Sequence, residues 1–153
     1  MNPLKQKDIY IASDHAGFEL KKAIIKHFDL NFVDLGPESS DSVDYPDYAH
    51  KVCSKVALAS KDSGMDSIGI LICGSGLGMA MAANKHPEIR AALCWNEESA
   101  KLSRQHNNAN VLCLAARLVD SSLNLKIIKV FVETVFEGGR HKNRIDKIPT
   151  ASN

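Results

Sequence analysis

The fold of this chain is decided by the stretch Ser67-Ile-Gly-Ile-Leu-Ile-Cys73 and by the loop that follows it, Gly74-Ser-Gly-Leu-Gly78. The first stretch is almost wholly apolar, which is typical of a parallel strand that is covered on both faces. The loop then leads directly into a helical pattern from Met79 to Lys85. A strand, a tight glycine turn and a helix in direct succession predict the central βα unit of a parallel sheet.

The same alternation of strand and helix continues on both sides of this unit. Four more short β-rich runs are expected as strands, at residues 9–12, 31–35, 90–95 and 110–115. Asn96 can cap the helix after residues 90–95, and a last helix is predicted from Asp120 or Ser121 to Gly138-Gly139. We therefore predict an α/β fold: a single-domain, Rossmann-like three-layer αβα sandwich with a five-stranded parallel sheet, in which ligands bind at the carboxyl ends of the strands.

The length and composition of the chain fit one domain. The 153 residues are predicted to form a single unit, 1–153, of which residues 138–153 are a basic C-terminal tail. Nineteen Lys and Arg against eighteen Asp and Glu give a net charge of +1, which argues against a general nucleic-acid-binding protein. No run approaches the roughly 18 apolar residues of a membrane helix, and the polar start has no signal-peptide core, so we expect a cytoplasmic protein without a membrane partner.

The four cysteines, at positions 53, 73, 94 and 113, form no C-x-x-C pair, so neither a zinc site nor a redox dithiol is expected. Cys53, Cys94 and Cys113 lie in apolar runs or on a helix face, which indicates buried small hydrophobic side chains. Cys73 differs, because it stands where the apolar strand meets the glycine loop. Backbone amides attract anions there, and a thiol with an ordinary pKa of about 8.5 becomes a usable base if its thiolate is stabilised.

Two other interpretations of the glycine loop stay open at this point. The glycines alone would serve to make a tight turn between a strand and a helix. The loop also resembles part of a dinucleotide fingerprint, with Glu97 at about the right distance downstream for a ribose contact. Its spacing, however, is G-x-G-x-G and not the G-x-G-x-x-G of that fingerprint. A nucleotide-binding or sensory module is therefore kept as an alternative to an enzyme.

Other candidate residues follow a strand or lie near the end of the chain. Asp14 and His15 come directly after the first strand and reach the same edge as Cys73 if the two strands are neighbours. The alternatives are a helix cap for Asp14 and an exposed loop position for His15. Arg140 and Arg144 are four residues apart, a spacing that places two guanidinium groups on one helical face suited to phosphate. A solvated basic tail is the alternative for these arginines.

Six motifs, taken in order, are specific where each alone is not. They are Ser13-Asp-His-Ala-Gly17, Asp44-Tyr-Pro-Asp-Tyr48, Ile72-Cys-Gly-Ser-Gly-Leu-Gly78, Ala82-Ala-Asn-Lys85, Leu102-Ser-Arg-Gln-His-Asn107 and Glu137-Gly-Gly-Arg-His141. On these motifs, the chain resembles over nearly its whole length the family of ribose-5-phosphate isomerase B and galactose-6-phosphate isomerase subunits. The resemblance implies an aldose–ketose isomerase that interconverts D-ribose 5-phosphate and D-ribulose 5-phosphate in the pentose phosphate pathway, by ring opening and enediolate proton transfer.

The resemblance also implies roles for the glycine loop. Cys73 would be the base that moves a proton between C1 and C2. The Ser75 hydroxyl and the backbone amides of the glycine loop would stabilise the enediolate oxygen. The loop glycines concerned are Gly74, Gly76 and Gly78. Family members without this cysteine use a glutamate a few residues along, where this chain has Met79 to Met81. The chain therefore resembles the cysteine type, for which no metal and no cofactor are expected.

By the same resemblance, His106 would open the furanose ring, whereas the residues alone equally allow an exposed side chain that complements a helix C-terminus. Asp14 and Tyr45 would contact sugar hydroxyls, and Asn107 would bind near the reacting end. The phosphate would be held by basic side chains, often from two subunits: His15, Arg117, Arg140 and Arg144. A homodimer or a dimer of dimers with shared sites is therefore expected.

Specificity stays open on the sequence. A galactose-6-phosphate isomerase subunit would need a dissimilar partner chain. Its pocket would also have to be larger by about one hydroxymethyl group. Six-carbon phosphates such as allose 6-phosphate also stay open as substrates.

Overall fold

A parallel sheet with β3 at its centre forms the middle layer of the molecule. The computed structural model describes residues 3–63 and 67–150. Within them the strands lie in the order β2-β1-β3-β5-β4, and every neighbouring pair is parallel. The strands are β1 (Ile9–Ser13), β2 (Phe32–Asp34), β3 (Ile68–Cys73), β4 (Ala91–Leu93) and β5 (Val111–Ala115). The predicted five-stranded sheet is confirmed, with edge strands β2 and β4 shorter than the sequence indicated.

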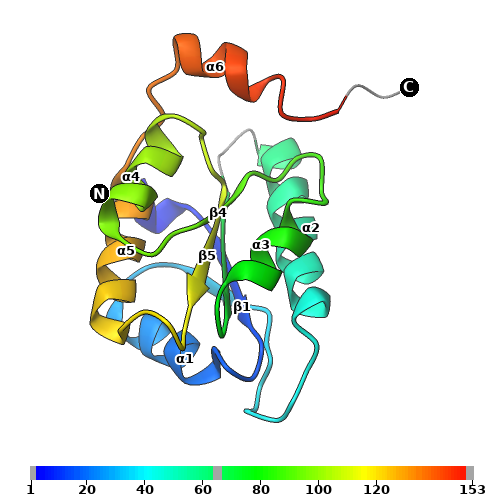
Figure 1. Cartoon of the computed structure of the whole chain (residues 1–153), viewed down its shortest axis with the longest axis vertical. Coiled ribbons are helices and arrows are strands. Elements are labelled where there is room, and N and C mark those ends of the chain that lie inside the picture. Colours follow the sequence, from blue (N-terminus) through cyan, green and yellow to red (C-terminus); the bar gives the residue numbers. More distant parts are fainter. Residues whose placement is uncertain (1–2, 64–66, 151–153) are drawn as a thin grey trace.

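Helices cover both faces of this sheet (Figure 1). They are α1 (Phe18–His27), α2 (Tyr45–Ser63), α3 (Leu77–Ala83), α4 (Glu97–Gln105), α5 (Ser121–Glu133) and α6 (Arg140–Ile145), and a 3-10 turn (Pro3–Gln6) precedes β1. α1, α4 and α5 pack on one face and α2 and α3 on the other, so the predicted three-layer αβα sandwich is confirmed. Among the described residues, no helix combines the length and the apolar character needed to cross a membrane.

The apolar run that predicts β3 is buried along its whole length. Ile70 and Ile72 pack into the core beneath α1, α4 and α5, whereas Leu71 and Cys73 pack into the core beneath α2 and α3. Because alternate side chains of a strand point to opposite faces, only a run without polar side chains can fill both cores. Each large apolar side chain that is fully buried here stabilises the fold by about 1.5–3 kcal/mol.

The last predicted helix ends earlier than its apolar pattern indicated. α5 stops at Glu133, because the backbone of Thr134 is extended, with φ of −86° and ψ of 130°. The Thr134 hydroxyl and amide both donate to the Val130 carbonyl, at 2.6 and 3.1 Å. The Thr134 carbonyl accepts a hydrogen bond from Arg104 Nε at 3.2 Å and is thereby held against α4. The prediction that Gly138-Gly139 ends this helix is wrong. These glycines instead precede α6, which carries Arg140 and Arg144 on one helix as the sequence predicted.

Lys21 is a buried charge that ties α1 to the segment before α2. Only 1% of its side chain is exposed, and its ammonium donates to Asp34 Oδ1 at 2.8 Å and to the Pro37 carbonyl at 2.7 Å. These partners replace the hydration that a buried ammonium loses. The segment held in this way continues to Val43, whose amide donates to His15 Nδ1 at 3.3 Å.

Replacing Lys21 with alanine is expected to lower the free energy of unfolding by about 2 kcal/mol or more, because the buried Pro37 carbonyl loses its donor and a cavity is left. Urea denaturation followed by circular dichroism measures the change. Lys22→Ala is the matched control, since Lys22 lies on the same helix with 60% of its side chain exposed. Equal denaturation midpoints for the two variants would contradict the structural role of Lys21.

Candidate active site

A cavity of about 350 Å³ lies where β1, β3 and β5 end. It is lined by predicted site residues together with Leu118: Asp14, Tyr45, Cys73, Gly74, Ser75, Gly78 and Arg117. Residues from separate motifs thus meet at the carboxyl edge of the sheet, where parallel α/β proteins bind ligands. A larger hollow of about 460 Å³ lies between residues 34–38 and α2, but none of the candidate residues lines it.

Backbone hydrogen bonds join the loops that follow the three central strands. The Asp14 amide donates to the Ile72 carbonyl at 3.0 Å, and the amides of Ala116 and Arg117 donate to the carbonyls of Cys73 and Gly74, each at 2.9 Å. β1 and β5 therefore flank β3 up to and beyond its last residue. The prediction that Asp14 reaches the same edge as Cys73 is confirmed, because β1 and β3 are neighbours.

Cys73 ends β3 beneath the glycine loop. Its Sγ accepts a hydrogen bond from the Gly76 amide at 3.1 Å, which holds the sulfur against the loop, and 5% of the residue is exposed. Gly76 has a φ of 75°, and a Cβ at this position would lie 2.4 Å from Leu93 Cδ1. Only glycine fits that conformation and that space. The position of the sulfur thus depends on a turn that tolerates no side chain.

The other three cysteines lie in the apolar cores, as the sequence predicted. Burial raises the pKa of the Cys53 thiol to about 12, and it also raises the pKa values of Cys94 and Cys113 above the ordinary value. A thiol that stays protonated near neutral pH is neither a base nor a nucleophile. Of the four thiols, Cys73 is the one that lines the cavity.

One aromatic and one basic side chain, Tyr45 and Arg117, pack against the glycine loop. A Cβ on Gly78 would lie 2.6 Å from Tyr45 Cζ, and a Cβ on Gly74 would lie 3.3 Å from Arg117 Cδ. The glycines therefore allow the Tyr45 ring and the Arg117 side chain to approach the loop backbone closely. Ser75 also lines the cavity, and its Oγ accepts a hydrogen bond from the Leu77 amide at 3.3 Å.

Asp14 and His15 are both held by neighbouring backbone. Asp14 is buried, and its Oδ1 accepts a hydrogen bond from the amide of Gly17, the residue that precedes α1. His15 accepts the Val43 amide on Nδ1, which assigns the ring proton to Nε2 if the imidazole is neutral. His15 follows Asp14, which lines the cavity, but His15 itself is not among the lining residues.

The remaining predicted residues lie at the opposite edge of the sheet. His106 follows the last residue of α4, and Asn107 comes next, so both precede β5, whereas Arg117 follows it. β5 has five residues, which place about 13 Å of strand between the two edges. α6, which carries Arg140 and Arg144, also lies beyond the edge where β5 begins (Figure 1). One chain therefore does not bring these four residues together with Cys73.

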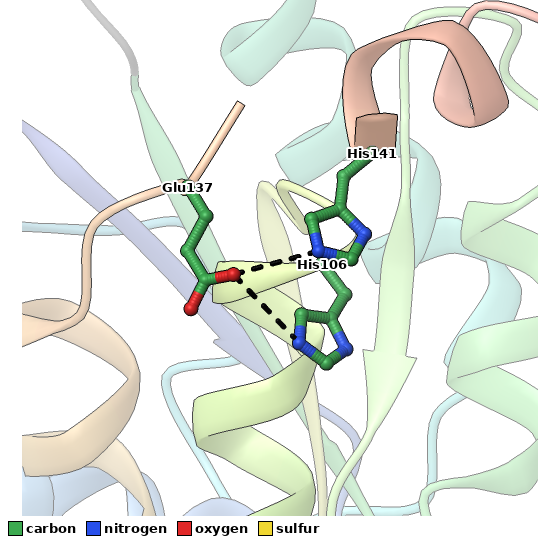
Figure 2. A group of neighbouring side chains, drawn as sticks. All are labelled: His106, Glu137 and His141. Carbon is green, nitrogen blue, oxygen red and sulfur yellow. Dashed lines mark ion pairs between the residues drawn. The ribbon is translucent and has the colours of Figure 1, made fainter. Parts of the chain in front are cut away.

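His106 belongs to a cluster for which no role was inferred from the sequence. Its Nε2 lies 3.9 Å from Glu137 Oε2, and His141 Nε2 lies 3.4 Å from the same oxygen (Figure 2). The two imidazole rings stack at 4.3 Å between centroids and 13° between planes. Such groups can bind metal ions. Both Nε2 atoms face the same Glu137 oxygen, so the arrangement also fits two stacked imidazoles that share a carboxylate.

Comparisons with known proteins agree with this geometry. A family model described as Ribose/Galactose Isomerase matches residues 9–148. A probable ribose-5-phosphate isomerase B of Mycoplasma genitalium is 53% identical over 145 residues, which cover 92% of this chain and 93% of the relative. The solved ribose 5-phosphate isomerase of Thermotoga maritima superposes with a TM-score of 0.85 at 47% identity, covering 94% of this chain and 97% of the other. The Mycoplasma genitalium ribose-5-phosphate isomerase B, solved with bound ribulose-5-phosphate, gives a TM-score of 0.83 at 50% identity, covering 92% and 93%. This chain belongs to the ribose/galactose isomerase family.

Proposed function

We propose that this chain is a ribose-5-phosphate isomerase that interconverts D-ribose 5-phosphate and D-ribulose 5-phosphate in the pentose phosphate pathway. The observation that carries the proposal is the position of Cys73, whose sulfur lies beneath the glycine loop in a cavity that Asp14 and Tyr45 also line. The relative solved with ribulose-5-phosphate, at 50% identity, supports this substrate. The four unpaired cysteines suit the reducing cytoplasm, which is the compartment we propose.

The chemistry assigned to the cavity is a proton transfer between adjacent carbons. The Cys73 thiolate removes the proton from C2 of the open-chain aldose, and an enediolate forms with its negative charge on O1. The same thiol returns a proton to C1, and the O2 hydroxyl proton passes to O1, so that O2 becomes the ketone oxygen and O1 a hydroxyl. Backbone amides of the glycine loop and the Ser75 hydroxyl surround the charge that develops. Asp14 and Tyr45 are placed to hold sugar hydroxyls.

Ring opening must come before this transfer, because ribose 5-phosphate is mostly a furanose. The group assigned to it, His106, lies at the far edge of the same chain, so a second subunit has to supply it. Two large side chains that line the cavity, Tyr45 and Leu118, are exposed, and so are Leu77 and Met81 of α3, as expected for a surface that a second copy covers. We propose a homodimer, or a dimer of dimers, in which each site takes Cys73 from one subunit and His106 from the other.

The phosphate would then be held from both sides. His15 and Arg117 lie at the carboxyl edge of one subunit, and Arg140 and Arg144 come with α6 of the other. Guanidinium groups bind phosphate through paired hydrogen bonds, so arginines from two subunits fix both the ligand and its enclosure. Asn107 arrives with His106 and would bind near the reacting end.

Replacing Cys73 with alanine is expected to reduce formation of ribulose 5-phosphate from ribose 5-phosphate by about 100-fold or more, because the group that carries the proton is lost. Cys53→Ala, which removes a buried thiol that does not line the cavity, is the control and should keep its turnover. Iodoacetamide should alkylate Cys73 alone in the folded protein, as mass spectrometry can show. Full activity of the Cys73 variant would refute the assignment of the base.

The substrate assignment has its own test. A wild-type protein that is inactive on ribose 5-phosphate but active on allose 6-phosphate or galactose 6-phosphate would change the substrate and leave the chemistry in place. Tight NAD binding without any isomerase activity would instead support a nucleotide-binding module.

The shared site predicts complementation between two inactive variants. Cys73→Ala and His106→Ala, each inactive alone, are expected to recover about a quarter of wild-type activity when co-expressed in equal amounts, since half of the dimers are mixed and one of their two sites is intact. The ribulose 5-phosphate assay on the co-purified proteins measures this. The co-expressed mixture of Cys73→Ala with itself is the control. No recovery in mixed dimers would place both residues in the site of one chain.

A further inference from the structure

The His106 side chain is held by groups that come from the other end of the chain. Glu137 lies between α5 and α6, and its backbone amide donates to the Gln105 carbonyl at 3.1 Å, which fixes this segment against the last residue of α4. Gly138 and Gly139, with φ values of 68° and 56°, then turn the chain so that α6 begins beside His106. The result is a set of three side chains, His106, Glu137 and His141, at one corner of the molecule (Figure 2).

Stacking sets the plane of the His106 ring. His141 is buried, with 9% of its side chain exposed, and its amide donates to the Gly138 carbonyl at 3.1 Å. It therefore offers a fixed surface on which the more exposed His106 ring lies, at 4.3 Å between centroids. An imidazole that transfers protons to a sugar must keep its nitrogens in a defined direction. The buried ring provides that direction without touching the sugar.

The Glu137 carboxylate sets the charge around the two rings. Two stacked imidazolium ions would repel each other, and a carboxylate oxygen 3.4 and 3.9 Å from the two Nε2 atoms offsets that repulsion. The longer distance belongs to His106, and catalytic hydrogen bonds of this kind often tighten only when substrate is bound. With Nε2 directed to Glu137, the other nitrogen of His106 is left for the substrate.

We propose that Glu137 is a positioning residue for ring opening, which acts through His106 and, together with His141, orients it. The inference rests on the proposed isomerase function and on the role of His106 within it. In the step concerned, the proton of the O1 hydroxyl leaves, the C1–O4 bond breaks, C1 becomes an aldehyde carbon and O4 gains a proton. His106 takes the first proton and gives the second. The Glu137 carboxylate stabilises the imidazolium that forms in between.

Deuterium exchange separates ring opening from the proton transfer at Cys73. Ribulose 5-phosphate has no furanose form, so exchange of its C1 hydrogen with heavy water requires the enediolate chemistry but not His106. Conversion to ribose 5-phosphate, which must then close its ring, requires both. The ratio of C1 exchange to conversion, followed by proton NMR in heavy water, therefore reports the ring step alone. Loss of the α6 arginines or of the fold would lower both reactions together and leave the ratio unchanged.

Glu137→Gln keeps the shape of the side chain and removes its charge. We expect it to raise the ratio of C1 exchange to conversion by about tenfold or more, and His106→Ala should change the ratio in the same direction. Glu137→Asp, which keeps the charge, should have a ratio closer to that of the wild type. Glu133→Gln is the matched control, because it removes an exposed carboxylate four residues earlier, and its ratio should equal that of the wild type.

The outcomes are distinct. A Glu137→Gln ratio equal to that of the wild type, whether both rates stay or both fall, overturns the proposal. A His106→Ala ratio equal to that of the wild type removes the role of His106 on which it rests. A wild-type protein that neither converts nor exchanges ribulose 5-phosphate overturns the proposed function itself.

Discussion

The five strands in the described part of the chain run in one direction, and this constraint divides the candidate site residues between two edges of the sheet. Every loop that follows a strand lies at one edge, and every loop that precedes a strand lies at the other. Cys73 and Asp14 follow strands, whereas His106 and Asn107 precede one. No side-chain movement spans the length of β5, so the two groups of residues meet only if a second copy presents its opposite edge. The direction of the strands is thus the reason why the proposed site requires two subunits.

The glycine loop shows why the sequence allowed several interpretations. Its glycines do make a tight turn, and they also admit close contacts, since Tyr45 packs on Gly78 and Leu93 packs on Gly76. The dinucleotide interpretation is not supported by the strand order. β5 lies between β3 and β4, so Glu97, which follows β4, is not on the strand next to the glycine loop. What the structure shows is that the loop and Cys73 line the same cavity.

Much of the fold could be predicted from local patterns. The buried run of β3 and the cap at Asn96, whose Oδ1 accepts the Ser99 amide at 2.8 Å, are set by residues that are neighbours in sequence. The end of α5 could not be predicted in this way, because the contact of Arg104 with Thr134 joins residues thirty positions apart. The contact of Glu137 and His141 with His106 could not be predicted for the same reason. Their four-residue spacing was visible, but its meaning depends on the end of α4.

The basic tail has a different physical character from the one its composition suggested. The segment that leads into it is tied to α4 through the Gln105 carbonyl and through Arg104, and His141 is buried at its start. The arginines of α6 therefore keep a fixed relation to His106 within each chain. In the proposed dimer, one subunit delivers the ring-opening group and the phosphate ligands together, at a spacing that its own packing determines. In that dimer, the distance from the α6 arginines of one subunit to Cys73 of the other would limit the length of the substrate. The contact between subunits would therefore determine which sugar phosphate fits.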